Sequence, residues 1–193
     1  MGGAFYRGLS KIFPPGSLFI CDRHAEKLKA LGAKHCGSDP NKILKDAQTV
    51  ILAVKPQSFS EFCQNLRVSL SKKLIISIMA GIGISTLRKK LSAAGGQKIV
   101  RAMPNLPVQV SLGMTGWIAT KNLNSIDKKL VRKIFQSMGK ELELKTEKKI
   151  DALGAISGCG PAYFFYFTEL LALRGQKMGF TKDEARQLAE AAF

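Results

Sequence analysis

The chain has 193 residues, of which 46% are hydrophobic, and a formal net charge of +16 at pH 7. This length suffices for one full domain and part of a second, and no apolar run approaches the roughly 20 residues that span a bilayer. The first residues also lack the charged-then-apolar layout of a signal peptide, so we expect a cytoplasmic protein with no membrane partner.

The first 145 residues alternate between apolar runs and helical patterns. An apolar run between breakers is typical of a strand that is buried on both faces, and helices between such strands indicate a parallel sheet. We expect helices at 2–9, 25–31, 41–46, 58–66 and 85–91, and strands at 17–21, 49–54, 74–78 and 98–100.

The pattern continues as far as residue 145 and then changes. Two further strands are expected at 114–119 and 141–144, with a helix at 126–138 between them. Beyond them only helical patterns follow, at 161–179 and 182–193. The sequence therefore predicts two domains: a Rossmann-like α/β domain with a doubly wound parallel sheet at 1–146, and the first part of an all-helical domain at 147–193.

Both ends of the chain stop inside a helical pattern. Residues 2–9 open a helix directly, where a doubly wound domain normally begins with a strand and a glycine-rich turn. Residues 182–193 end without a helix-capping signal. We therefore expect a fragment that is truncated at both ends and that lacks the first strand of its sheet.

Four strand ends offer candidate binding residues, because ligands of doubly wound folds bind at the carboxyl ends of the strands. Asp22 stands where an acid would bind the ribose hydroxyls of adenosine, and Arg23 where a guanidinium would meet a 2′-phosphate. Having both leaves the choice between NAD and NADP open. The other three strand ends are 53–56, 80–81 and 102–105, and Gly81 would let the backbone approach a flat ring closely.

Two segments rich in proline and glycine, 101–107 and 157–163, are expected to be stiff turns. Prolines on both sides of Asn105 would present its side chain in a fixed way. The second segment would join the two domains and carry Pro161 in the first turn of the long helix.

The sequence offers no catalytic residue of its own. It has no nucleophile–base pair, no Gly-x-Ser-x-Gly and no Walker-type phosphate loop, so we expect a bound cofactor to carry the chemistry. Four cysteines and two histidines form no ligand set, and we expect neither a metal site nor disulfides. Cys21 and Cys63 lie in apolar stretches and are expected to be small core residues.

Three segments resemble pyrroline-5-carboxylate reductases, the last enzymes of proline biosynthesis. They read VRAMPNLP at 100–107 with Gly-Met-Thr at 113–115, ILAVKPQ at 51–57, and ISGCGPAY at 156–163. The order and spacing follow the family over nearly the whole chain. The resemblance implies a Rossmann domain followed by a helical domain that interlocks with its partner in a homodimer or a larger homo-oligomer. It also implies hydride transfer from NADPH or NADH to the C=N bond of 1-pyrroline-5-carboxylate, which gives L-proline.

The resemblance assigns residues to three parts of the site. Met1 and Gly2 would be the tail of the phosphate-binding turn, and the 39–41 loop would lie by the adenosine. Glu147 matches a family position close to the substrate. The candidate cofactor-binding residues are Met1, Gly2, Asp22, Arg23, Asn41, Ala53, Val54, Lys55, Pro56, Ala80, Gly81, Ala102, Met103, Pro104 and Asn105.

The family's opening strand, its Gly-x-Gly turn and a Ser-Pro-Gly-Gly-Thr-Thr segment that closes over the substrate are not among these 193 residues. We therefore expect the isolated chain to be inactive or nearly so. The alternatives are a non-catalytic nucleotide-binding module and a nucleic-acid-binding protein. The latter rests on charge alone. The basic residues stand in scattered pairs with no interleaved aromatic residues, which favours a solvated lysine-rich surface without nucleic acid as a partner.

Overall fold

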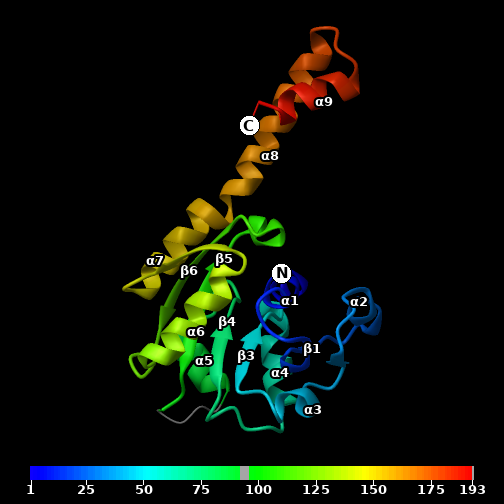
Figure 1. The fold of residues 1–193 in the computed structure, drawn as a ribbon. Helices are drawn as coiled ribbons and strands as arrows, with labels where there is room; N and C mark the ends of the chain where they lie inside the picture. Colours follow the sequence, from blue (N-terminus) through cyan, green and yellow to red (C-terminus); the bar gives the residue numbers. More distant parts are fainter. Residues whose placement is uncertain (92–95, 193) are drawn as a thin grey trace.

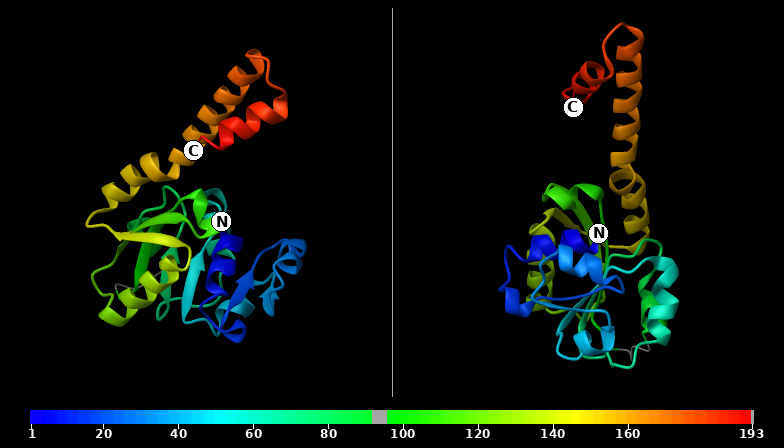
Figure 2. Two further views of the ribbon diagram at one scale, coloured as in Figure 1. Left: turned by 45° about the horizontal axis from the view of Figure 1, so that its top comes forward. Right: turned by 90° about the vertical axis from the view of Figure 1, so that its right-hand side faces the viewer.

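The computed structural model describes residues 1–91 and 96–192. It consists of an α/β body and an arm of two helices that projects away from it (Figures 1 and 2). We use "body" for residues 1–153 and "arm" for residues 160–190.

The strands of the body form two sheets. β1 (Phe19–Cys21) and β2 (His35–Gly37) form a parallel pair that stands apart from the second sheet. The second sheet has five strands in sequence order: β3 (Thr49–Leu52), β4 (Leu74–Ser77), β5 (Ile99–Pro104), β6 (Gly113–Ala119) and β7 (Gly139–Glu143).

The expectation of a wholly parallel sheet is wrong at one place, because β5 and β6 are antiparallel. The connection between them holds only the short 3-10 helix Leu106–Val110, and a parallel crossover needs a dozen or more residues. The other neighbouring strands of this sheet are parallel, and α6 (Ser125–Gln136) provides the crossover between β6 and β7.

Helices cover both faces of the five-stranded sheet (Figure 2). On one face, α1 (Gly2–Leu9) and α6 pack on Ile76, Val100 and Trp117. On the other face, α4 (Phe59–Gln64) and α5 (Ile84–Lys90) pack on Val50, Ile75 and Ile99. Successive strand residues thus enter opposite layers, as the apolar runs predicted. The short helices α2 (Ala25–Ala30) and α3 (Pro40–Leu44) flank the β1–β2 pair.

Neither proline-and-glycine segment is the turn that we expected. Arg101 to Pro104 continue β5 and pair with Ile118 to Thr115 of β6, so the strand is twice the expected length. The second segment is helical. α7 (Glu147–Leu153), which was not predicted, leads into the π-helical turn Gly154–Gly158, and α8 (Gly160–Lys177) follows with Pro161 in its first turn. We therefore predicted too little regular secondary structure in the two segments where prolines and glycines suggested loops.

The arm is a hairpin of α8 and α9 (Lys182–Glu190), which approach closely where Gly175 meets Ala185. α8 has no buried residue, and the expected helix end at Phe193 lies outside the described residues. Large apolar side chains cover the surface of α8, among them Tyr163, Phe165 and Tyr166 at 62–64% exposure. No helix that the structure describes is both long enough and apolar enough to cross a membrane.

Candidate functional site

The carboxyl ends of β3, β4 and β5 lie on one edge of the five-stranded sheet, because these strands are parallel. We call this the carboxyl edge: residues 53–56, 80–81 and 102–105. The N-terminus of α1 lies at the same place (Figure 1), since a Cβ added to Gly2 would lie 3.3 Å from the Cβ of Ala53. Met1 is the N-cap of α1 and is 46% exposed. A helix N-terminus at a strand end is a suitable place for an anion.

Two exposed positions of the carboxyl edge show why these residue types are used. Gly81 has a φ of +74°, a conformation that other residues adopt only with strain. The carbonyl of Lys55 accepts from the N–H of Ser58, which starts the 3-10 helix at Pro56. The Lys55 ammonium has no ion-pair partner within 1–91 and 96–192. Its charge is therefore available to a ligand at this edge.

The Asn105 amide is fixed by β6. Its Oδ1 accepts from the N–H of Met114 at 2.8 Å, and its own N–H donates to the carbonyl of Met114 at 3.2 Å. The Nδ2 group makes no hydrogen bond to a described residue. The strand thus holds the oxygen of the amide, and its two N–H donors remain for a ligand.

The other predicted residues of this strand end are more enclosed. Ala102 is 1% exposed and packs in the core under α1 and α6, and Pro104 is also buried. Met103 is half-buried on the opposite face. There, Cβ atoms added to Gly154 and Gly158 would lie 3.4 and 3.2 Å from its Cε. Among the side chains of this segment, only Met103 and Asn105 are partly exposed.

Asp22 and Arg23 follow β1 and so belong to the separate two-stranded sheet. Asp22 accepts from the N–H of His24 at 2.9 Å and closes a tight turn, whereas Arg23 is exposed. Cys21, expected in the core, is exposed at the end of β1. Partial burial of its sulfur raises the pKa of the thiol to about 11, and the nearby Asp22 and Asp39 carboxylates add to the rise.

Asn41 uses its side chain within the fold. Its Nδ2 donates to the carbonyl of Asn65 at 3.1 Å, and its Oδ1 accepts from the N–H of Arg67 at 2.7 Å. Asp39 is the N-cap of α3 and accepts from the Asn41 N–H, as the Asp-Pro pair indicates. The Asn41 side chain therefore ties α3 to the segment after α4, and its backbone N–H is taken up by Asp39, so neither donor is left for a cofactor.

Glu147 meets Arg101, a residue that sequence reasoning did not single out. Arg101 is 5% exposed and donates to Oε1 of Glu147 at 3.1 Å and to Oδ1 of Asp151 at 2.5 Å. Oε1 of Glu147 also accepts from the N–H of Ile84 at 3.0 Å. An arginine between Val100 and Ala102, inside an apolar strand, was the sequence signal of a buried charge that needs a partner, although it does not say which residue that partner is.

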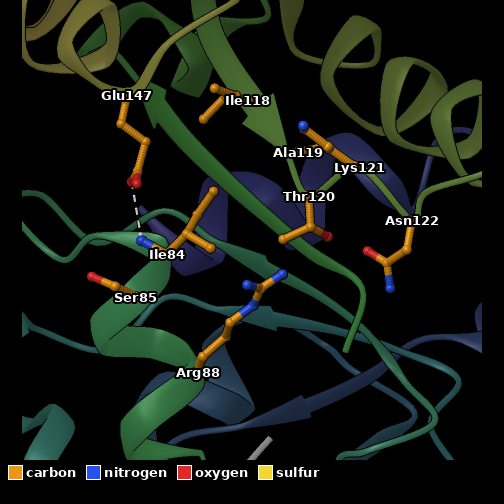
Figure 3. A pocket seen from close by; sticks show the side chains of 9 residues that line it. All are labelled: Ile84, Ser85, Arg88, Ile118, Ala119, Thr120, Lys121, Asn122 and Glu147. Atoms are coloured by element: carbon orange, nitrogen blue, oxygen red, sulfur yellow. Dashed lines mark hydrogen bonds between the residues drawn. The ribbon is translucent and has the colours of Figure 1, made fainter. Parts of the chain in front are cut away.

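A groove of about 550 Å³ lies between α5 and the end of β6 (Figure 3). Glu147 is the only predicted site residue that lines it, and its carboxylate reaches across to the backbone of Ile84. The groove is therefore separate from the carboxyl edge. Its lining residues are Ile84, Ser85, Arg88, Ile118, Ala119, Thr120, Lys121, Asn122 and Glu147.

Comparison with known proteins gives two family matches. Residues 1–81 match the family described as NADP oxidoreductase coenzyme F420-dependent, and residues 147–193 match the family described as pyrroline-5-carboxylate reductase dimerisation. Pyrroline-5-carboxylate reductase of Pasteurella multocida is 33% identical over 98% of this chain and 71% of its own length. That of Methanosarcina acetivorans is 34% identical over the same shares.

Solved structures agree with these matches. A pyrroline-5-carboxylate reductase from Coxiella burnetii superimposes with a TM-score of 0.87 at 31% identity, over 99% of this chain and 72% of that one. The Plasmodium falciparum pyrroline carboxylate reductase with NADP bound gives a TM-score of 0.88 at 34% identity, over 100% of this chain and 71% of that one.

Among the described residues, no group of three or more His, Cys, Asp or Glu side chains could hold a metal ion.

Proposed function

This chain belongs to the pyrroline-5-carboxylate reductase family, and from that premise we propose that its protein reduces 1-pyrroline-5-carboxylate to L-proline with NADPH or NADH. The observation that carries the proposal is the carboxyl edge, where three strand ends meet the N-terminus of α1. The alternative, a non-catalytic nucleotide-binding module, is not favoured, because the named relatives are reductases.

The residues at the carboxyl edge suit a dinucleotide. Gly2 lets the helix terminus approach Ala53, so backbone N–H groups could face a pyrophosphate without a side chain between them. Arg23 and Lys55 have no ion-pair partner in the described part of the chain, and their charges match those of phosphates; Arg23 could pair with a 2′-phosphate. The exposed backbone at Gly81 and the Nδ2 of Asn105, which donates to no described residue, would lie on the nicotinamide half.

The proposed reaction is a hydride transfer, for which the cofactor supplies the hydride when it is bound. The hydride adds to the imine carbon, and a proton on the imine nitrogen makes that carbon more electrophilic and remains in the amine product. The part of this chain is to bind and orient. The carboxyl edge would hold the nicotinamide ring. The substrate would lie between that ring and the root of the arm, by which we mean α7 and the π-helical turn (residues 147–158).

The arm provides the proposed dimer contact. α8 exposes Tyr163, Phe165 and Tyr166, and apolar surface of this extent on a soluble protein marks a contact with another chain. The match of residues 147–193 to the reductase dimerisation family supports a second copy as the partner. We also propose the division into domains at 1–146 and 147–193, although α7 packs on β5 and β6.

We propose the cytoplasm as the site of action. Cys21, Cys36, Cys63 and Cys159 are all free thiols, as is usual in a reducing compartment. Fractionation of the source cells would test this location.

The test of the function has two arms. The chain itself is titrated with NADPH and followed by NADPH fluorescence. The full-length product of its gene is then assayed for NADPH oxidation with and without pyrroline-5-carboxylate. Oxidation that requires the imine is expected, and cofactor binding without turnover by the full-length product would contradict the proposal.

A matched pair of variants tests the cofactor position. Gly2→Val would push a side chain against Ala53, and we expect it to weaken NADPH binding at least tenfold. Gly16→Val is the control, because nothing lies within 4 Å of a Cβ at that position. Equal affinity in the two variants would place the cofactor elsewhere.

A further inference from the structure

We propose that Arg101 is a positioning residue, which fixes the root of the arm to the strand that leads into the carboxyl edge and thereby sets the affinity for the imine substrate. This inference rests on the proposed function and adds a residue that the sequence did not single out. Arg101 does not reach the edge itself, so its effect on the site has to act through α7.

The geometry of Arg101 joins three elements. Its side chain is 6% exposed and leaves β5 on the face that carries α5. The guanidinium donates to Glu147 and Asp151, which stand one helical turn apart on α7. Because Glu147 also accepts from the N–H of Ile84, the start of α5 is included in the same cluster.

Met103, the next residue on the same face of β5, also contacts the segment that follows α7, but through apolar packing. Met103 lies against Gly154 and Gly158, the first and last residues of the π-helical turn. Beside it on β6, Gly116 leaves space for the side chain of Leu153, where a Cβ would collide. Ion pairs at 101 and packing at 103 thus hold α7 and the π-helical turn along the length of the strand.

The consequence for the site follows from the direction of the chain. β5 (Ile99–Pro104) runs past Arg101 toward Asn105, and α7 leads through the π-helical turn into α8. The antiparallel pairing of residues 102–104 with β6 does not depend on the guanidinium, so the carboxyl edge would survive its loss. α7 would lose its ion pairs to β5, and only the packing on Met103 and Gly116 would then hold the segment that leads into the arm. π-Helical turns are frequent at functional sites, and here the turn directly follows the helix that Arg101 holds.

The experiment compares Arg101→Met with Arg101→Lys and with Arg132→Met in the full-length gene product. Arg132 is the matched control, because it also pairs with two carboxylates, Glu141 and Glu143, but lies on α6 away from the arm. KM for pyrroline-5-carboxylate, kcat and the NADPH dissociation constant are measured for each. Hydrogen exchange of the peptide 147–158 is measured by mass spectrometry.

For Arg101→Met we expect KM for the imine to rise at least tenfold, NADPH affinity to stay within about twofold, and exchange in 147–158 to accelerate. Arg101→Lys should recover part of KM, since an ammonium can hold one carboxylate but lacks the fork that holds two. Loss of folded protein alone would lower kcat and leave KM unchanged. An unchanged KM in both Arg101 variants, or equal changes in Arg132→Met, would overturn the inference. If the wild type showed no turnover, the proposed function would fail, and unchanged exchange in 147–158 would still refute the role of Arg101.

Discussion

Arg101 donates to Oε1 of Glu147 at 3.1 Å, and the same oxygen accepts from the N–H of Ile84 at 3.0 Å. Glu147 was expected near the substrate, but one of its oxygens already serves two elements of the fold. The carboxylate therefore stabilises the fold by linking β5 to the start of α5, whatever else it contacts.

Because Glu147 links Arg101 to α5, we expect Glu147→Ala to destabilise the fold. The change leaves the buried guanidinium with one partner and removes the acceptor of the Ile84 N–H. Breaking a buried pair costs about 3–5 kcal/mol, and because the Glu147 side chain is 37% exposed we expect a loss of about 2 kcal/mol in the free energy of unfolding. Urea unfolding measures it. In the control, Glu143→Ala, both basic partners, Lys128 and Arg132, are 42% exposed rather than buried, so the loss should be about 1 kcal/mol or less. Equal losses would show that the Arg101 cluster has no special weight.

Arg23 is predicted to select the cofactor. Its exposed guanidinium follows β1, where a 2′-phosphate would lie, and it has no ion-pair partner among the residues described. Arg23→Ala should weaken NADPH binding about tenfold, or roughly 1.4 kcal/mol, and leave NADH binding nearly unchanged. Fluorescence titrations with both cofactors measure this, with Lys27→Ala on α2 as the control for general loss of positive charge. A parallel loss for NADH and NADPH would argue against recognition of the 2′-phosphate.

Cys21 is predicted to react slowly in spite of its exposure. Its raised pKa of about 11 means that only about 0.1% of the thiol is ionised at pH 8, and the thiolate is the nucleophile. Iodoacetamide labelling, quantified on the Cys21 peptide, should rise with pH and reach its midpoint near 11. A midpoint at 9 or below would show that Asp22, Asp39 and partial burial do not act on the sulfur.

The raised pKa of Cys21 also predicts how the stability of the protein changes with pH. The folded state keeps the Cys21 proton between about pH 9 and 11, where the unfolded state loses it. Cys21 should therefore make the protein less stable as pH rises through that window. Cys21→Ser should flatten this part of the pH profile of unfolding.

The apolar surface of α8 is predicted to be the dimer contact. Phe165 is 62% exposed, and Phe165→Glu would place a charge in a dry interface. Sedimentation velocity of the full-length product should show a shift from dimer to monomer. Ile126→Glu on α6 is the control, because Ile126 is 77% exposed but lies off the arm. A variant Phe165→Glu that stayed dimeric would exclude this part of α8 from the interface.

The sequence was sufficient where one physical rule dominated. The apolar runs at 49–54 and 74–78 predicted buried strands and contain β3 and β4, and the pair Asp39-Pro40 indicated the start of α3. Parallel β3, β4 and β5 then placed three strand ends on one edge without further information.

It was insufficient where tertiary pairing overrode local preference. Met103 and Pro104 belong to β5 because β6 pairs with them, and Ser157 and Gly158 are helical because α7 and α8 continue through them. The Arg101 cluster joins residues 46 and 50 positions apart, so no local pattern could reveal its partners. Cys21 resembled a core residue, but the short β1–β2 pair leaves it uncovered.

The central claim is tested most directly by following the transferred hydrogen. The full-length gene product is incubated with pyrroline-5-carboxylate and NADPH that carries deuterium at both C4 positions, and the proline formed is analysed by mass spectrometry and NMR. We predict proline with one deuterium on the former imine carbon. A product without deuterium at that carbon, or no proline at all, would contradict the account.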